Sequence, residues 1–462
     1  MPISSSLLPI LRCPFCDTSF EFEERPRPEQ GAAEFGILHC GTHEFPVVDG
    51  IPIIQRSPVG MFEHTRGTAQ VKGIAVHEVV RLIESGETLM ALLECLAVPV
   101  LPAVLWRALG WRLSHSHAAV RFARQLGRNK FKAQVLSSRN EVSAREVFEF
   151  YYQPGGPLDP ELGHYFVRRF GQPRHVAALA LAALIDPRGK PVLDIACGAG
   201  HLDHYLTQRG DNAAVVGLDL NFYHLWVAQH WIAPSAHFVC ANAGEGLPFR
   251  NDTFSATLCS DAYHYIAGRK SLLSEIDRCA PGRPVVLTRV GNAAVMPNEG
   301  HEDTLEGYLH ELGPMYDRAF DESELVRGYL RRQNPFVQPS RGATELGECK
   351  WLSFVLNASA LARQQQTGGA DWPHAVGELG LNPIYTPTPG PGGNLRLRFE
   401  FPSVGYAYEN HGMLAYHPAV ITVARAQLSA LPAGREDAEL SKLVESFVLL
   451  GMPRRFVRRL PG

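Results

Sequence analysis

The chain has 462 residues, of which 45% are hydrophobic and 20% are charged, so it contains enough apolar residues for two or three globular domains. Its 44 basic and 47 acidic side chains give a net charge of −3, which argues against a bulk attraction for nucleic acid. The chain opens without the basic and apolar regions of a signal peptide, and the apolar run at 95–106 is too short to span a bilayer. We therefore expect a cytoplasmic protein.

Two pairs of metal-type residues lie near the N-terminus. Cys13 and Cys16 form a Cys-x-x-Cys pair, and Cys40 and His43 form a Cys-x-x-His pair. Two such pairs supply the four ligands of a tetrahedral zinc ion and leave no position for water. The sequence therefore predicts one structural Zn²⁺ at these four residues.

The segment that follows, 45–54, predicts two short strands joined by a turn at Asp49 and Gly50. Together with the two ligand pairs, this pattern resembles the small zinc-ribbon proteins, which often have cysteine where this chain has His43. The resemblance implies a zinc-ribbon-like domain over residues 1–58. A ribbon without metal, held by its β core, is the alternative.

Residues 59–150 show helical periodicity and predict a helical linker or subdomain. The stretch from 107 to 139 is basic and contains no acidic residue; its basic residues are Arg107, Arg112, Arg121, Arg124, Arg128, Lys130, Lys132 and Arg139. One interpretation is a face that pairs with acidic residues elsewhere, such as those of 299–324. The other is a docking face for an anionic partner, namely a carrier protein, a phosphorylated substrate, RNA or a membrane surface.

The stretch 191–220 organises the rest of the chain. A short apolar run ends in Asp194, glycines follow at 198 and 200, and a helical segment leads to a second β-branched run that closes on Asp219. This order of strand, glycine turn, helix and strand is half of a nucleotide-binding α/β unit. The glycines let the backbone approach a ligand, and Asp219 is placed to accept the hydroxyls of a ribose.

The segment Asp194-Ile-Ala-Cys-Gly-Ala-Gly200 resembles the first motif of the class I S-adenosylmethionine (SAM)-dependent methyltransferases, with Ala196 in place of the first glycine. Later segments continue the likeness: strands at 238–242, 257–261 and 285–289, and a linking Leu-Pro-Phe at 247–249. The resemblance implies the following cofactor-binding residues: Asp194, Ala196, Gly198, Gly200, Asp219, Leu220, Asn242, Ala243, Ser260 and, from the preceding helices, Tyr152.

The same resemblance implies a doubly wound, Rossmann-like α/β sheet of seven strands in the family order 3-2-1-4-5-7-6. We expect residues 151–295 to form the SAM-binding core and 296–462 to form a cap or lid insertion with the last strands. Two β-rich runs, 350–356 and 419–424, are the predicted sixth and seventh strands. Between them, the Pro- and Gly-rich stretch 386–401 predicts an extra hairpin or an extended lid.

Three side chains follow the predicted fourth strand, where a doubly wound sheet binds its ligands. His264 is the preferred general base because its unperturbed pKa lies near working pH, and Tyr263 and Asp261 are the other predicted catalytic residues. Asp261 has a second interpretation, as a structural residue or a cofactor contact.

The sequence therefore favours SAM-dependent methyl transfer to a small or carrier-bound metabolite of a secondary or cell-envelope pathway. One alternative is an RNA methyltransferase of the kind that modifies a guanine in ribosomal RNA, since such enzymes also carry an N-terminal zinc ribbon. A second is a SAM-binding protein that does not methylate and acts as a cyclase or a scaffold. The acceptor atom, O, N or C, stays open.

Overall fold

The structure is a computed structural model that divides into two compact units. It describes residues 3–25, 34–60, 73–96, 117–152, 159–187, 189–209, 214–296, 301–337, 339–361, 372–425, 428 and 438–456. The first unit comprises Met1–Val167, Gly198–Gly200 and Val216–Asn251. The second comprises Arg168–Cys197, His201–Val215 and Asp252–Gly462. No helix in the described ranges is both long and apolar enough to cross a membrane.

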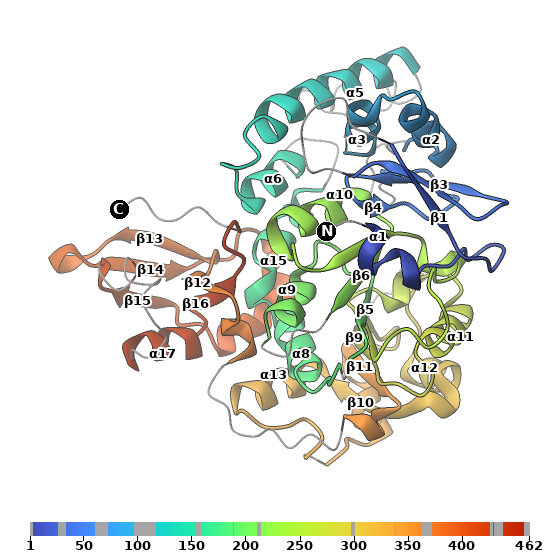
Figure 1. The fold of residues 1–462 in the computed structure, drawn as a ribbon. Helices are drawn as coiled ribbons and strands as arrows, with labels where there is room; N and C mark the ends of the chain where they lie inside the picture. Colours follow the sequence, from blue (N-terminus) through green and yellow to red (C-terminus); the bar gives the residue numbers. More distant parts are fainter. Residues whose placement is uncertain are drawn as a thin grey trace. The chain divides into compact units, whose positions relative to one another are not determined.

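The first unit begins with an antiparallel sheet in the order β1-β2-β3-β4, drawn in blue in Figure 1. Its strands are β1 (Glu21–Glu24), β2 (Gly36–His39), β3 (Glu44–Val48) and β4 (Ile51–Pro52). β3 and β4 meet at Asp49 and Gly50, whose φ angles of 51° and 83° make the tight turn that the sequence predicts. Ile53 then forms a parallel bridge with Cys240. The N-terminal sheet is thus joined by backbone pairing to the end of a strand of the large sheet.

Helices make up most of the rest of the first unit. They are α1 (Ile3–Ser6), α2 (Val76–Glu84), α3 (Thr88–Leu96), α5 (His117–Phe131), α6 (Ala144–Tyr151), α7 (Pro160–Val167) and α10 (Phe222–Val227). Where the basic stretch is described, two of its members pair within this unit: Arg128 with Glu94, and Arg139 with Asp49. Neither partner belongs to the acidic segment 299–324. Arg107 and Arg112 lie outside the described residues.

The large sheet has the strand order β10-β11-β9-β8-β5-β6-β7. Its strands are β5 (Val192–Ile195), β6 (Val215–Asp219), β7 (His237–Cys240), β8 (Ala256–Ser260), β9 (Val285–Gly291), β10 (Tyr316–Asp321) and β11 (Trp351–Leu356). The pairs β5 with β8, β8 with β9 and β6 with β7 are parallel, whereas β11 is antiparallel to both β9 and β10. The α/β, Rossmann-like class that the sequence predicts is confirmed.

Burial explains why these runs form central strands. Every residue of β5 and of β9 is buried, as expected for strands with helices on both faces of the sheet. The helices of the second unit are α8 (Pro173–Ala182), α9 (His201–Gln208), α11 (Arg269–Cys279), α12 (Leu305–Leu312), α13 (Glu322–Leu330), α14 (Ala343–Gly347), α15 (Val404–Asn410) and α17 (Ala438–Glu445).

The predicted sixth and seventh strands need a correction. The run at 350–356 is in the sheet as β11, but the strand beyond it at the edge is β10, which precedes it in the chain. The run at 419–424 is not in this sheet: its strand β15 (Val420–Val423) pairs with β14 (Leu395–Phe399). Local β propensity located these strands, but pairing distant in sequence decides which sheet a strand joins.

The remaining strands form two small antiparallel sheets. One pairs β12 (Glu378–Leu381) with β16 (Leu449–Met452), and the other has the order β13-β14-β15, with β13 at Tyr385–Pro389. The β13–β14 pair is the extra hairpin that the sequence predicts. In β14 the buried Leu395 and Leu397 alternate with the exposed Arg396 and Arg398, so one face of this sheet packs on a local core.

Candidate functional site

Two tight turns near the N-terminus bring four metal-type side chains together. Cys13 and Cys16 belong to the first turn, in which the Asp17 amide donates to the Cys13 carbonyl at 3.0 Å. Cys40 and His43 belong to the second, in which the Cys40 amide donates to the His43 carbonyl at 3.1 Å. One ligand atom from each of the four residues lies within 4.8 Å of the others. We call these four residues the Cys/His cluster.

The spacing of these atoms suits a tetrahedral zinc ion. The sulfurs of Cys16 and Cys40 are 3.4 Å apart, and Nδ1 of His43 lies 3.8 Å from the Cys13 sulfur and 3.6 Å from the Cys40 sulfur. Zinc bonds of about 2.3 Å to sulfur and about 2.0 Å to nitrogen, at tetrahedral angles, separate neighbouring ligand atoms by about 3.5–3.8 Å. All four atoms are electron-pair donors, so the cluster fits Zn²⁺.

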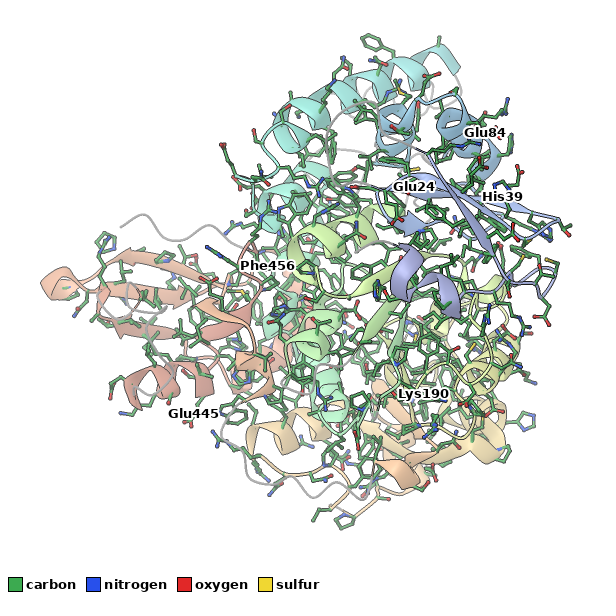
Figure 2. The ribbon with its side chains drawn as sticks, viewed as in Figure 1. Glu24, His39, Glu84, Lys190, Glu445 and Phe456 are labelled. Carbon is green, nitrogen blue, oxygen red and sulfur yellow. The ribbon has the colours of Figure 1, made fainter. Side chains whose placement is uncertain are left out.

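His39, labelled in Figure 2, stands next to Cys40 in the sequence but is not part of the cluster. Its ring nitrogens lie 3.2 Å from a carboxylate oxygen of Glu23 and 3.3 Å from one of Glu44. His39 is the last residue of β2, whereas Cys40 begins the turn, so the two neighbours have different partners.

Asp49, in the turn between β3 and β4, is only 4% exposed and accepts a hydrogen bond from the Trp226 indole at 2.8 Å. His230 also contacts its carboxylate at 2.9 Å. Burial alone would raise the pKa of Asp49, but His230 and Arg139 outweigh that effect and lower the pKa to about 2. This turn is thus fixed to the helical segment after β6 by a buried carboxylate.

Asp219 lies at the end of β6 and is bound to the glycine loop. Its Oδ2 accepts a hydrogen bond from the Gly198 amide at 2.9 Å, and its Oδ1 accepts one from the Asn221 amide at 2.8 Å. Burial raises the pKa of Asp219, although these two amides act in the opposite direction. The carboxylate is therefore held in one orientation and retains lone pairs for the hydroxyls of a ligand.

The glycine loop uses the left-handed backbone region at three positions. The φ angles are 56° at Ala196, 56° at Gly198 and 75° at Gly200. Glycine adopts such angles freely, whereas an alanine there costs roughly 1–2 kcal/mol. Ala196 therefore carries a conformational cost that the glycine of the family motif would not. Asp194, at 2% exposure, is buried in β5 just before the loop.

Asn242 and its neighbours form a short turn after β7. The side-chain oxygen of Asn242 accepts from the Gly244 amide at 3.0 Å, and its amide group donates to Glu245 at 3.1 Å. Ala243 is buried, and Leu220 is 38% exposed. The structure thus gives Asn242 a local capping role, and the predicted contacts of these three residues with a cofactor stay predictions.

Tyr152, which the sequence places near the cofactor, is only 3% exposed. Its hydroxyl lies 2.7 Å from Nε2 of His224, and its ring stacks on Phe166 at 5.9 Å between centroids. Burial lowers the pKa of His224 to about 3, so that ring is neutral near pH 7. A Cβ built on Gly198 would lie 3.6 Å from Phe166. Aromatic side chains thus line one side of the glycine loop.

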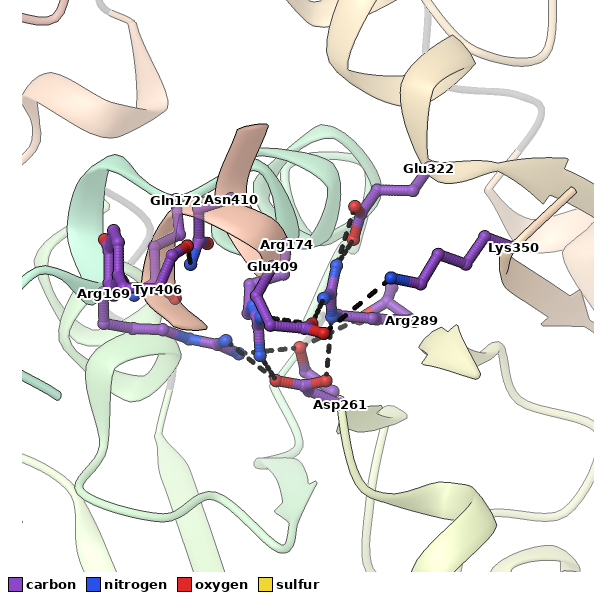
Figure 3. A network of polar contacts seen from close by, with 12 residues as sticks. Arg169, Gln172, Arg174, Asp261, Arg289, Glu322, Lys350, Tyr406, Glu409 and Asn410 are labelled. Carbon is purple, nitrogen blue, oxygen red and sulfur yellow. Dashed lines mark hydrogen bonds and ion pairs between the residues drawn. The ribbon is translucent and has the colours of Figure 1, made fainter. Parts of the chain in front are cut away.

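At the end of β8, Asp261 is the centre of a buried ionic network in the second unit (Figure 3). Its carboxylate lies 3.1 Å from Arg169, 2.8 Å from Arg174 and 3.1 Å from Arg289. Burial alone would raise the pKa of Asp261, but Arg174, Arg289 and Arg169 hold it well below its ordinary range. Asp261 is therefore an anion held by three guanidinium groups and is not suited to taking up a proton. Ser260, just before it, lies 3.4 Å from Arg169 and accepts from Thr288 at 2.9 Å.

The network extends beyond Asp261 through Arg289. Both oxygens of Glu322 lie 2.8 Å from Nη1 of Arg289, and Glu409 lies 2.7 Å from its Nη2. Asp261 and Arg289 have φ angles of 63° and 52°, a strained conformation for residues other than glycine. Asp261 follows the last residue of β8, and Arg289 lies within the adjacent parallel strand β9. We call Asp261, Arg169, Arg174, Arg289, Glu322, Glu409 and Lys350 the Asp261 network.

Tyr263 and His264 follow Asp261 but differ in their surroundings. The Tyr263 hydroxyl donates to Glu311, and burial is the main reason that the Tyr263 pKa is raised above its ordinary value. His264 is 2% exposed, and burial lowers its pKa to about 4. Within the described residues, Nδ1 of His264 has no hydrogen-bond partner. Of the three predicted catalytic residues, His264 alone is placed to take up a proton.

The sequence did not point to several residues that complete these sites. They are Arg169, Arg174, Arg289, Glu322, Lys350 and Glu409 in the network, Glu311 beside Tyr263 and His224 beside Tyr152. One signal was available: Asp261 and Arg289 are the last residues of the neighbouring predicted strands 257–261 and 285–289, and opposite charges at one edge of a parallel sheet are placed to pair. The others come from segments remote in sequence.

Residues 192–281 match a family model described as a methyltransferase domain. A phthiotriol/phenolphthiotriol dimycocerosates methyltransferase from Mycobacterium tuberculosis is 35% identical over 99 residues, which are 21% of this chain and 36% of that protein. Its counterpart from Mycobacterium ulcerans is 34% identical over 109 residues, 23% of this chain and 40% of that protein. The chain thus spans well under half the length of the curated relatives it matches.

Among solved structures, geranyl diphosphate C-methyltransferase from Streptomyces coelicolor aligns with a TM-score of 0.30 and 15% identity, over 39% of this chain and 78% of that chain. A SAM-dependent methyltransferase from Corynebacterium glutamicum aligns with a TM-score of 0.29 and 22% identity, over 43% of this chain and 98% of that chain. The match over residues 192–281 shows that the chain carries a methyltransferase domain.

Proposed function

We propose that this chain transfers a methyl group from SAM to a hydroxyl of a small or carrier-bound metabolite, of the kind used in cell-envelope or secondary biosynthesis. The single observation that carries the proposal is Asp219, a buried carboxylate at a strand end that is bound to the Gly198 amide at 2.9 Å. The methyltransferase-domain match over 192–281 supports the cofactor. The triols named in the curated relatives support an alcohol as acceptor.

The residues present suit SAM as a ligand. We propose that the Asp219 carboxylate binds the ribose hydroxyls, and that the backbone at Gly198 and Gly200 approaches the methionine part closely. Asp194, Ala196, Leu220, Asn242, Ala243, Ser260 and Tyr152 complete the proposed cofactor-binding set. When bound, SAM supplies an electrophilic methyl group on a sulfonium ion.

The protein's part in the reaction is to orient the acceptor and to remove its proton. His264 is the proposed base because its Nδ1 has no hydrogen-bond partner within the described residues and its ring is neutral at pH 7. Burial lowers its pKa to about 4, which makes it a weaker base than a free histidine. Asp261 is ionised but held by three arginines, so we propose that it positions the loop that carries His264. Tyr263, bonded to Glu311, supports the same loop from the other side.

For the N-terminal cluster we propose one structural zinc per chain, held by Cys13, Cys16, Cys40 and His43. The tetrahedral spacing of the four donor atoms supports this assignment. A closed site of four protein ligands has no position for a substrate, so the ion would stabilise the small sheet β1–β4.

The proposal is tested by methyl transfer from isotope-labelled SAM, with the full chain and two acceptors: a long-chain diol and ribosomal RNA. We expect label in the diol, and His264→Gln should lower kcat by about 10²–10⁴-fold with SAM affinity unchanged. Tyr265→Phe, a change in the neighbouring and 43% exposed ring, is the matched control and should keep its activity. Label in RNA alone would favour the RNA alternative, and SAM binding without transfer to either acceptor would favour a protein that does not methylate.

A further inference from the structure

Glu409, which Figure 3 shows in contact with the cations around it, is the member of the Asp261 network with the most exposed side chain. Its side chain is 37% exposed, against 10% for Asp261 and 11% for Glu322. Oε2 of Glu409 lies 2.7 Å from Arg289 and 3.4 Å from Arg174, and Oε1 lies 3.8 Å from Lys350. One carboxylate therefore faces three cations from three different elements.

The net charge of the Asp261 network becomes more positive if the Glu409 side chain moves out of it. The network contains four cations, Arg169, Arg174, Arg289 and Lys350, and three carboxylates, so it carries a net charge of +1. Without Glu409 that charge becomes +2. The side chains of Arg174 and Arg289 are 9% and 1% exposed, so water cannot replace the lost partner fully. A buried guanidinium that lacks a counter-ion attracts an oxyanion.

The other two carboxylates are bound differently. Asp261 contacts three arginines, and Glu322 binds Nη1 of Arg289 through both of its oxygens. Both side chains are nearly buried, and moving either one away would break several contacts. Glu409 extends from α15, whose Tyr406 and Asn410 are buried and hold the helix, so its side chain can turn outward while the helix stays in place.

The position of these cations favours a substrate subsite. Arg289 follows the residues of β9 that pair with the end of β8, at the edge where open α/β sheets bind ligands. Its guanidinium carbon lies 3.9 Å from the centre of the Trp351 ring, and the His264 ring lies 6.5 Å from the same ring. Trp351 therefore neighbours both Arg289 and the proposed base.

We propose that Arg174, Arg289 and Lys350 form an oxyanion subsite for the substrate, and that Glu409 occupies this subsite until a carboxylate or phosphate group of the substrate displaces it. The proposal rests on the proposed function, which it deepens by naming a charged group that the methyl acceptor carries. With Glu409 displaced, Nη2 of Arg289, Nη2 of Arg174 and the Lys350 ammonium are the donors that meet the oxygens of either group.

The test is a titration of the full chain with inorganic phosphate at constant ionic strength. Calorimetry measures the affinity, and thermal unfolding measures the change in Tm. Glu409→Gln removes the internal competitor, so we expect it to bind phosphate at least tenfold more tightly than the wild type. Lys350→Met in the Glu409→Gln background should weaken that binding at least fivefold. Glu400→Gln is the matched control, because among the described residues Glu400 forms its ion pair with the exposed Arg398 on β14, and its loss should leave phosphate affinity unchanged.

Equal phosphate affinity in the wild type and Glu409→Gln would overturn the proposal and leave the network a purely structural one. A parallel titration with acetate distinguishes the two anion sources: tighter binding of acetate points to a carboxylate substrate, and tighter binding of phosphate to a phosphorylated one. If Glu409→Gln does not fold, phosphate should still raise the Tm of the wild type more than that of Lys350→Met, and equal shifts would overturn the proposal.

The same titrations are repeated with saturating S-adenosylhomocysteine. We expect phosphate still to bind, and competition between the two would overturn the assignment of this subsite to the acceptor. Failure of S-adenosylhomocysteine to bind would instead contradict the proposed function. The two proposals can therefore fail separately.

Discussion

The Cys/His cluster of the first unit and the Asp261 network of the second both gather polar side chains away from water, but their charges differ. The cluster consists only of electron-pair donors and contains no cation. The network contains cations and carboxylates in nearly equal number, and they satisfy one another. A set of donors alone suits a metal ion, as we propose for the cluster, whereas a mixed network is complete without a ligand and can accept one only in exchange.

The largest effect expected from this comparison is at the cluster. Cys40→Ser should lower the zinc content from about one ion per chain to near zero, because zinc binding in small closed sites supplies about 10–16 kcal/mol. The sheet β1–β4 should then lose its protection against hydrogen exchange. Cys349→Ser, at a half-buried cysteine outside the cluster, is the control. Metal analysis of wild-type protein purified without chelators that finds no zinc would remove the site.

A single substitution in the Asp261 network should have a smaller effect on stability than the loss of zinc from the Cys/His cluster. Asp261→Asn leaves three buried or nearly buried arginines without their shared carboxylate, and breaking such a pair costs about 3–5 kcal/mol of unfolding free energy. Urea denaturation measures this loss against Glu400→Gln, whose exposed pair should contribute under about 1 kcal/mol. Similar stabilities of the two variants would show that the network is not a structural unit.

His264 should make the stability of the second unit depend on pH. Its pKa is about 4 in the folded chain and about 6.5 when unfolded, so the unfolded state takes up the proton first as the pH falls. Its contribution to stability is complete above pH 6.5 and declines towards pH 4, by on the order of 3 kcal/mol. His264→Gln should remove this part of the decline in denaturation measured from pH 7 to 4. Parallel pH profiles for the wild type and the variant would contradict the lowered pKa.

The sequence predicted the parts of the fold that depend on local pattern. The strands β5, β6 and β8, which end at Ile195, Asp219 and Ser260, appear where the apolar runs and the glycine loop indicate them. The edge strand β10 was missed because its sequence, Tyr-Asp-Arg-Ala-Phe-Asp, carries three charges and only Ala319 and Phe320 are buried. Such an edge strand forms because β11 lies beside it, and a local pattern does not contain that information.

Site residues, like strands, were predicted where they depend on a local pattern. The residue pairs of the Cys/His cluster lie close in sequence, so spacing alone identified them. The contacts of Asp261 come from residues about 90 positions before it and about 30 after it, and no local signal joins them. Hence the sequence left Asp261 open between a catalytic role and a structural or cofactor-binding one, and could not predict the three arginines that surround it.

The central claim, that the Asp219 carboxylate serves a SAM site, is tested most directly by calorimetric titration of the full chain with S-adenosylhomocysteine. We expect the wild type to bind and Asp219→Ala to bind more than tenfold more weakly, a loss of about 1.4 kcal/mol or more in binding free energy. Asp277→Ala, an exposed carboxylate on α11, should bind as the wild type does. Equal affinity of Asp219→Ala and the wild type, or no binding by the wild type, would contradict the claim.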